Sequence, residues 1–352
     1  MSFIEKNPTV TVIVCAYQSG KEILPTLQSI LAQSYTDFEF LIIDDASGDT
    51  TPDVIRSIDD PRISLIENEK NLGVVGSRNK GIRMARGEFI AHCDHDDIWA
   101  PDKLTKQVAF LSDNPDYGLV STNLTKTIGG KTIRQSDTVH KSHNFLRWSI
   151  LLDSTFAHSA VLYRSECVSK HHLQYYPEYT FADDWDFFLQ IAKVTKIACI
   201  PEPLVIYRLH EANWSNRASD EMHSNGKAVF YKEINYWLES SVLKEDTDAY
   251  FDVMVRGVPG PAFEQLIKAG SIGFKLYEAF MEKCLPDSND TLFIRKLMSE
   301  HWWRAVRNFA NRNGPGNLRI FFSQKTPNWN PPGKHKILLE YLKCSVKTIL
   351  LR

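Results

Sequence analysis

Residues 9–17 read TVTVIVCAY, and residues 38–45 read FEFLIIDD. Both segments are continuous runs of mostly β-branched and aromatic residues, which is typical of strands buried on both faces. The apolar residues between them, over 23–31, recur at the spacing of a helix. A strand, a helix and a second strand in this order predict the beginning of a parallel α/β sheet.

The alternation of strand and helix patterns continues along the chain. Helices are expected at 76–86 and 102–111, a hairpin at Gly129-Gly130, and further strands at 63–66, 88–93, 117–123, 159–164 and 196–209. From about residue 218 the pattern is helical. The sequence therefore predicts a mostly parallel, Rossmann-like α/β sheet flanked by helices in residues 1–216, followed by a helical C-terminal region in 217–352.

Carboxylates follow two of the expected strands directly. Asp44 and Asp45 end one strand, and the segment 94–97, DHDD, ends another. Ligands of open α/β sheets bind outside the carboxyl ends of the strands, so both clusters predict one polar site. Three acids crowded at one strand end repel one another, which a bound cation explains better than a solvated turn. The alternative is that Asp97 caps the next helix.

Composition excludes several classes of protein. The chain of 352 residues is 43% hydrophobic and 24% charged, which is average for a globular protein. Its six cysteines form no CxxC pair, so we expect reduced thiols. The N-terminal residues 1–10 lack the pattern of a signal peptide, and no window approaches the ~20 apolar residues of a membrane span. We therefore expect a cytoplasmic protein.

The net charge of −2 conceals a strong asymmetry. Residues 291–352 contain twelve Lys or Arg and two Glu, so that this end carries +10 and the remainder −12. Within it, residues 336–352 have the pattern of an amphipathic cationic helix, and Trp302 and Trp303 lie nearby. The segment predicts docking on an anionic membrane surface, at the inner face of the cell membrane. An ordinary packing helix is the alternative.

Five segments in order carry a resemblance to a known family: TVIVCAYQSG (11–20), LIIDDASGDTT (41–51), NLGVVGSRNKGIRMARGEFIAHCDHDDIWAP (71–101), FADDWDFFLQIA (181–192) and YRLHEANWS (207–215). They resemble the family-2 inverting glycosyltransferases over about residues 8–216. The resemblance implies the A-type glycosyltransferase fold, a nucleotide-sugar donor that is usually a UDP-sugar, Mn²⁺ or Mg²⁺, and inversion at the anomeric carbon. It also implies a saccharide or lipid-linked acceptor, with bacterial cell-surface polysaccharide synthesis as the commonest setting.

The resemblance assigns residues to the metal and the diphosphate. Asp96 matches the second acid of the family's DxD motif, which implies a direct metal ligand, and Asp94 would serve the metal or the ribose. Carboxylate oxygens suit Mn²⁺ or Mg²⁺, and the metal offsets charge on the departing diphosphate. His210 matches a histidine that often lies near the metal and diphosphate. The alternative for His210 is a surface histidine.

Other positions match those that bind the nucleotide. Ala16 and Tyr17 end the first expected strand, where the Tyr17 ring would stack on the base. Asp45 would accept a hydrogen bond from the uracil imide, and Arg78 would reach the base or the diphosphate. The alternatives are a packing role for Tyr17, a turn cap for Asp45 and a surface cation for Arg78. Asp44 is expected to be structural.

The reaction needs a base to take a proton from the acceptor hydroxyl. Asp184 matches the second residue of the family's Glu-Asp pair, which implies that it is this base. The first residue of the pair is Asp183 here, a departure that leaves its contact with the acceptor open. Adjacent like charges raise a carboxyl pKa toward a useful value. The alternative is that these acids only complement the dipole of a helix.

Proteins of three other classes fit the sequence less well. A sugar-1-phosphate nucleotidyltransferase would need a Gly-rich basic loop after the first strand, where this chain has CAYQSGKEI (15–23). A non-catalytic nucleotide-sugar or polyanion-binding protein would not need Asp96 and Asp184 together. A dehydrogenase would need a GxGxxG segment after a strand, which the sequence lacks. No nucleic-acid partner is expected.

Overall fold

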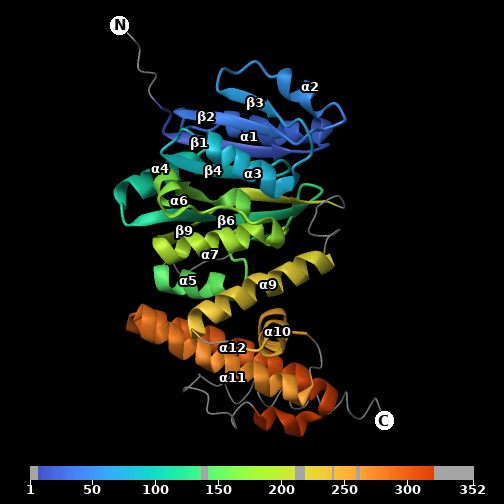
Figure 1. The fold of residues 1–352 in the computed structure, drawn as a ribbon, viewed down its shortest axis with the longest axis vertical. Helices are drawn as coiled ribbons and strands as arrows, with labels where there is room; N and C mark the ends of the chain where they lie inside the picture. Colours follow the sequence, from blue (N-terminus) through green and yellow to red (C-terminus); the bar gives the residue numbers. More distant parts are fainter. Residues whose placement is uncertain (1–6, 136–141, 211–218, 240–241, 259–261, 321–352) are drawn as a thin grey trace. The chain divides into compact units, whose positions relative to one another are not determined.

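The computed structural model describes residues 7–135, 142–210, 219–239, 242–258 and 262–320 (Figure 1). The chain forms two compact units, one of Met1–Ile150 with Ser154–Gly226 and one of Leu151–Asp153 with Lys227–Arg352. The first unit contains the sheet, and the second is helical. The expected α/β sheet and the helical C-terminal region are both confirmed.

The sheet of the first unit has the strand order β3-β2-β1-β4-β8-β6-β9-β5, with β7 paired to β6. Its strands are β1 (Val10–Ala16), β2 (Phe38–Asp44), β3 (Ile63–Glu67), β4 (Phe89–Asp94), β5 (Ile98–Trp99), β6 (Tyr117–Ile128), β7 (Lys131–Gln135), β8 (Leu162–Arg164) and β9 (Lys196–Leu209). β1 to β4 pair in parallel, as does β6 with β9, whereas β5, β7 and β8 run antiparallel to their neighbours. The sheet is therefore mixed, and its parallel half brings the ends of β1, β2 and β4 to one edge.

Helices cover this sheet. They are α1 (Leu24–Leu31), α2 (Thr51–Arg56), α3 (Gly73–Met84), α4 (Lys103–Asp113), α5 (His143–Leu152), α6 (Ser165–His171) and α7 (Asp183–Val194), with short 3₁₀ turns η1 (Gly20–Ile23), η2 (His158–Ala160) and η3 (Pro177–Tyr179). α3 packs on β1 and β2, and α7 packs on β6 and β9. A Cβ atom at Gly81 would lie 2.7 Å from Ile13 Cγ2, so only glycine lets α3 approach β1 this closely.

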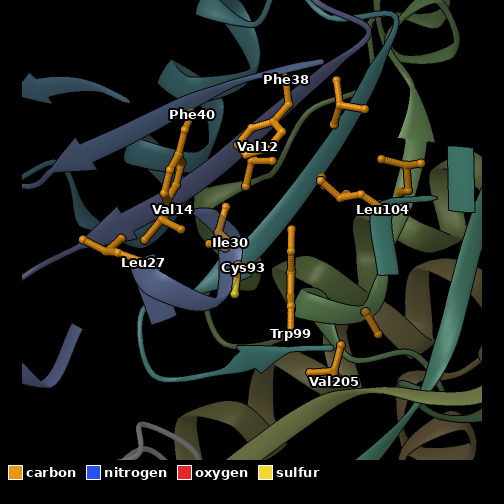
Figure 2. Packing of buried hydrophobic residues seen from close by; sticks show 14 of the residues in the cluster. Val12, Val14, Leu27, Ile30, Phe38, Phe40, Cys93, Trp99, Leu104 and Val205 are labelled. Atoms are coloured by element: carbon orange, nitrogen blue, oxygen red, sulfur yellow. The ribbon is translucent and has the colours of Figure 1, made fainter. Parts of the chain in front are cut away.

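The core of the first unit follows from the apolar runs of the sequence. Figure 2 shows side chains of β1 and β2 packed against α1: Val12, Val14, Phe40, Leu27 and Ile30 are all fully buried. Burying one such side chain stabilises the fold by about 1.5–3 kcal/mol. The cluster continues under β4 and β9 and so holds the strand ends of the site in place.

Two segments begin at residues other than those expected. α3 starts at Gly73, not residue 76. The Asp45 carboxylate accepts a hydrogen bond from the Leu72 amide at 2.7 Å, and this amide is one of the groups at a helix start that have no partner within the helix. The segment expected as a strand at 159–164 is a 3₁₀ turn, η2, followed by β8. Ser159 leaves the sheet there because its hydroxyl and carbonyl bind Asp97 and the Trp99 indole.

The second unit contains α10 (Lys244–Tyr250), η4 (Phe251–Arg256), α11 (Phe263–Cys284), α12 (Ser288–Asn313) and η5 (Pro315–Arg319), and α9 (Ser219–Leu238) runs into it. α11 packs closely on its neighbours, since a Cβ at Gly270 would lie 3.1 Å from the Trp302 ring. Trp302 and Trp303 are 0% and 4% exposed, so these two residues pack inside the protein and do not contact a membrane. The expected helix at 336–352 lies outside the described residues. Among the helices that are described, none has the length and apolar character needed to span a membrane.

Candidate active site

The acidic residues after β4 lie at the carboxyl edge of the sheet. Asp94 ends β4, and its Oδ1 atom accepts from Arg78 Nη2 at 3.1 Å and lies 3.2 Å from His158 Nδ1. Burial opposes ionisation of Asp94, but His158 and Arg78 outweigh it and hold the pKa of this carboxyl well below its usual range. Asp94 is therefore a carboxylate at neutral pH.

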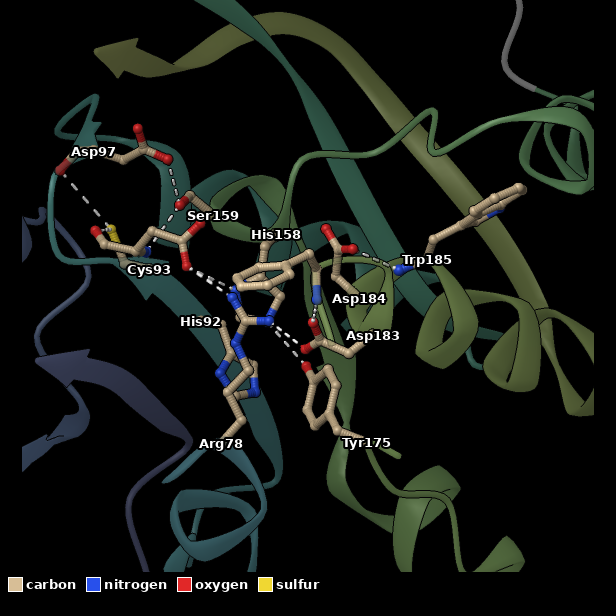
Figure 3. Close-up of polar contacts among 12 residues, drawn as sticks. Arg78, His92, Cys93, Asp97, His158, Ser159, Tyr175, Asp183, Asp184 and Trp185 are labelled. Atoms are coloured by element: carbon tan, nitrogen blue, oxygen red, sulfur yellow. Dashed lines mark hydrogen bonds and ion pairs between the residues drawn. The ribbon is translucent and has the colours of Figure 1, made fainter. Parts of the chain in front are cut away.

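Arg78 connects the strand end to the start of α7. Its Nη1 donates to Asp183 Oδ2 while its Nη2 donates to Asp94, so one guanidinium joins two carboxylates from distant parts of the sequence (Figure 3). The side chain is buried, and the two carboxylates raise its pKa despite the cost of burial. The structure thus places Arg78 inside the site as a bridge, where the sequence analysis expected contact with the base or the diphosphate.

Asp183 and Asp184 begin α7 and have different surroundings. Asp183 is buried, accepts from Arg78 through Oδ2, and accepts from the Phe181 amide through Oδ1 at 3.1 Å. Asp184 is half-buried and accepts from the Trp185 amide at 2.7 Å. Burial, and next the charge of Asp183, raise the pKa of Asp184 to about 6. Asp184 therefore has the properties of a proton acceptor near neutral pH.

Asp96, in the loop after β4, contacts the end of β9 and the residue that follows it. Its Oδ2 lies 3.0 Å from His210 Nε2, and its carbonyl accepts from Arg208 at the end of β9. The described residues contain no cluster of three or more His, Cys, Asp or Glu that could hold a metal ion. One carboxylate and one imidazole still fit Mn²⁺ or Mg²⁺ in a nucleotide site, since such ions keep several waters and bind phosphate oxygens. Asp94 has other partners, Arg78 and His158.

Asp97 stabilises the loop after β4 through a hydrogen bond with Ser159. It is buried, and its Oδ2 accepts from the Ser159 hydroxyl at 2.6 Å, while that hydroxyl accepts from the Asp94 amide at 2.9 Å. Burial and the charges of Asp94 and Asp96 raise the Asp97 pKa. The alternative in which Asp97 caps the next helix is wrong, because the chain enters β5 first and Asp102 occupies the cap position of α4.

The residues expected to bind the nucleotide gather at the ends of β1 and β2. Tyr17 is 41% exposed, which leaves its ring accessible. The Asp45 amide donates to the Ala16 carbonyl at 2.8 Å, which joins the two strand ends. Asp45 is buried, and its Oδ1 accepts from Asn68 Nδ2 and the Leu72 amide, both at 2.7 Å. Asp44, expected to be structural, is buried and accepts from the Ser47 amide.

Sequence reasoning missed two residues of the site, His158 and Tyr175. His158 comes from η2 and Tyr175 from the segment before η3, and neither lies in a recognisable motif. Their side chains are buried and meet at 3.0 Å. The one sequence signal was that His158 directly precedes an expected strand, which occurs too often to identify a site.

Comparison with known proteins shows the family to which this chain belongs. The sequence model described as "Glycosyl transferase family 2" matches residues 11–168. An uncharacterized glycosyltransferase of Haemophilus influenzae is 30% identical over 245 residues, which are 67% of this chain and 76% of that protein. The chain belongs to glycosyltransferase family 2. The nucleotidyltransferase, dehydrogenase and non-catalytic alternatives are thereby set aside.

Two further similarities bear on this family 2 glycosyltransferase. The Escherichia coli enzyme "UDP-Glc:alpha-D-GlcNAc-diphosphoundecaprenol beta-1,3-glucosyltransferase WfaP" is 39% identical over 102 residues, 29% of this chain and 41% of that enzyme. The chain thus spans less than half of that relative. Staphylococcus aureus TarS 1–349, solved with UDP-GlcNAc, has a TM-score of 0.59 and 17% identity, covering 91% of this chain and 93% of TarS. This likeness confirms the A-type glycosyltransferase fold.

Proposed function

We propose that this glycosyltransferase transfers a sugar, with inversion, from a UDP-sugar to a hydroxyl of a saccharide or lipid-linked acceptor, in the synthesis of a bacterial cell-surface polysaccharide. The observation that carries the proposal is that Arg78 joins the donor-side carboxylate Asp94 to Asp183, and that Asp184, the neighbour of Asp183, has a pKa raised to about 6. The name of WfaP and the UDP-GlcNAc in the TarS structure support a UDP-sugar donor and a lipid-linked acceptor.

In the proposed reaction, Asp184 accepts the proton of the acceptor hydroxyl while the oxygen attacks the anomeric carbon. Attack from the face opposite the leaving group inverts that carbon. Asp184 suits the task because the first helical turn of α7 fixes it, and because burial, and next the charge of Asp183, keep its pKa raised. Removing a general base typically lowers rates by about 10²–10⁴-fold.

On the donor side, Asp96 and His210 would hold the divalent cation, and Asp94 would bind the ribose or the cation. A bound Mn²⁺ or Mg²⁺ supplies positive charge to the departing diphosphate. Tyr17 would stack on the uracil ring and Asp45 would accept from its imide. These roles are supported by the positions of the side chains at the ends of β1, β2, β4 and β9.

The donor is tested directly with purified protein. We expect Mn²⁺-dependent hydrolysis of one or a few UDP-sugars in a panel that also contains GDP-, dTDP- and CMP-sugars. Released nucleotide is measured by chromatography. Hydrolysis of only GDP- or dTDP-sugars would refute the UDP assignment, and equal rates with excess chelator would refute the metal requirement.

The rate of transfer is expected to fall as the pH is lowered through about 6. The Asp184 pKa is raised to about 6, so below that pH the carboxyl is protonated and accepts no proton. The measurement is kcat against pH with saturating donor and acceptor. The residual activity of an Asp184→Asn variant should lack this acidic limb. A wild-type kcat that stays constant from about pH 7 down to about pH 5 would contradict the role.

Membrane docking through residues 291–352 remains part of the proposal. We expect the full chain to sediment with anionic phosphatidylglycerol liposomes and not with neutral ones at low salt, because each cation near such a surface contributes about 1 kcal/mol. Truncation after Ile320 keeps α12 whole and removes half of the +10 charge, so it should weaken sedimentation. Equal sedimentation with both liposome types, or none with either, would return these residues to a packing role.

A further inference from the structure

His158 lies between the donor-side carboxylate and a buried tyrosine. It is 5% exposed, and its ring stacks on Phe188 and packs against His92 at a centroid distance of 4.6 Å. Its Nδ1 lies 3.2 Å from Asp94 Oδ1, and its Nε2 lies 3.0 Å from the Tyr175 hydroxyl. Both ring nitrogens are therefore engaged, one of them by a residue of the proposed donor site (Figure 3).

Asp94 fixes the direction of one of these hydrogen bonds. A carboxylate oxygen accepts hydrogen bonds, so the 3.2 Å contact with Asp94 Oδ1 places a hydrogen on His158 Nδ1. His158 Nε2 lies 3.0 Å from the Tyr175 hydroxyl, so a second hydrogen bond holds the other side of the imidazole. Hydrogen bonds therefore connect three side chains in series, from Tyr175 through His158 to Asp94.

Tyr175, at one end of this hydrogen-bonded series, is held rigidly. The Tyr175 amide donates to Asn79 Oδ1 at 3.0 Å, and its carbonyl accepts from Asn79 Nδ2 at 2.8 Å. The Tyr175 ring stacks on Phe187 of α7 with centroids 4.2 Å apart. Tyr175 is thus fixed to both α3 and α7, which leaves His158 little freedom to turn.

Asp94, at the other end of the series, keeps one carboxylate oxygen available. Arg78 and His158 both donate to Oδ1, and no hydrogen bond or ion pair to Oδ2 is present in the part of the chain that the structure describes. The Asp94 side chain is 34% exposed. Two donors on one oxygen orient the carboxylate plane and leave the other oxygen without a donor among the described residues.

We propose that His158 is a positioning residue, which orients Asp94 for the donor by donating from Nδ1 to Oδ1, with Tyr175 holding the imidazole in place through Nε2. The proposal rests on the proposed function, in which Asp94 binds the ribose or the metal. Hydrogen-bond partners of this kind change metal affinity by about 10–100-fold when they are lost. His158 acts through Asp94 and does not itself touch the reacting atoms.

Two amide substitutions separate the two ends of the imidazole. In His158→Asn the amide nitrogen lies close to the position of Nδ1 and can still donate to Asp94. In His158→Gln the amide reaches the position of Nε2 and keeps only the Tyr175 contact. We expect the affinity for UDP-sugar with Mn²⁺, measured by calorimetry, to stay within roughly threefold of wild type in the Asn variant and to fall at least tenfold in the Gln variant. KM for the donor should follow the same order, and KM for the acceptor should not change.

Controls distinguish positioning from folding and from failure of the proposed function. His92→Asn removes a neighbouring buried imidazole that binds Tyr163 and not Asp94, so it should leave donor affinity unchanged. Thermal melting of every variant reports folding. Equal loss in the Asn and Gln variants, or none in the Gln variant, would overturn the proposal while Asp94→Ala still weakens binding. If Asp94→Ala binds the donor normally, the proposed role of Asp94 itself is wrong.

Discussion

Asp184→Asn is expected to lower sugar transfer by about a hundredfold or more while donor affinity stays unchanged. Asn has the same shape and keeps the hydrogen bond from the Trp185 amide, but it cannot take up a proton at neutral pH. The loss should therefore lie in kcat and not in KM for the donor. Single-turnover transfer and calorimetry with the UDP-sugar measure the two quantities separately.

Asp183→Asn is the matched comparison for this prediction. Asp183 is paired with buried Arg78, and breaking a buried ion pair costs about 3–5 kcal/mol. We expect this variant to lose folding stability in a thermal melt, whereas Asp184→Asn should melt like the wild type or slightly higher, since it removes charge repulsion beside Asp183. Near-normal transfer by a folded Asp184→Asn protein would move the base to another residue, with Asp183 as the next candidate.

Asp96→Ala is expected to abolish the metal-dependent part of donor binding. The substitution removes the carboxylate that approaches His210 to 3.0 Å and would coordinate the cation, so the diphosphate charge is left uncompensated. Calorimetry with UDP and a UDP-sugar, with Mn²⁺ and with chelator, measures the effect. His210→Ala should give a smaller loss, because one ligand would remain.

The outcome that contradicts this assignment is a Mn²⁺-dependent affinity in Asp96→Ala equal to that of the wild type. A buried control is Asp97→Asn, which can keep its hydrogen bond with Ser159. It should retain metal-dependent binding, since Asp97 supports the loop without reaching the donor. A loss in Asp97→Asn as large as in Asp96→Ala would indicate that the loop itself, and not a ligand, had been disturbed.

Continuous apolar segments were the most predictable part of this fold. β1 and β2 lie within one or two residues of the expected 9–17 and 38–45, because burial on both faces demands unbroken hydrophobic runs. β5 was missed, since two residues have no period to recognise. The start of α3 also could not be predicted locally, because the carboxylate that accepts a hydrogen bond from the Leu72 amide belongs to Asp45, 27 residues earlier, just after β2.

The candidate site, like the fold, could be predicted from the sequence only in part. Motif resemblance singled out Asp94, Asp96 and Asp184. Asp94 ends β4, Asp96 lies in the loop after it, and Asp184 lies in the first turn of α7. The resemblance could not show that Arg78 would join Asp94 to Asp183, because that contact spans 105 residues of sequence on one side. Nor could it find His158, whose role depends on a partner, Asp94, that is 64 residues away.

The bridge made by Arg78 limits how this enzyme can be recombined with its relatives. A chimaera that exchanges the segment after α5 would bring a new first acid of the Glu-Asp pair, one methylene longer, against an unchanged guanidinium. Lysine at position 78 would not reproduce this bridge, since all donors of an ammonium sit on one nitrogen and it lacks the planar fork. Grafts intended to change acceptor preference should therefore carry position 78 and position 183 from the same parent.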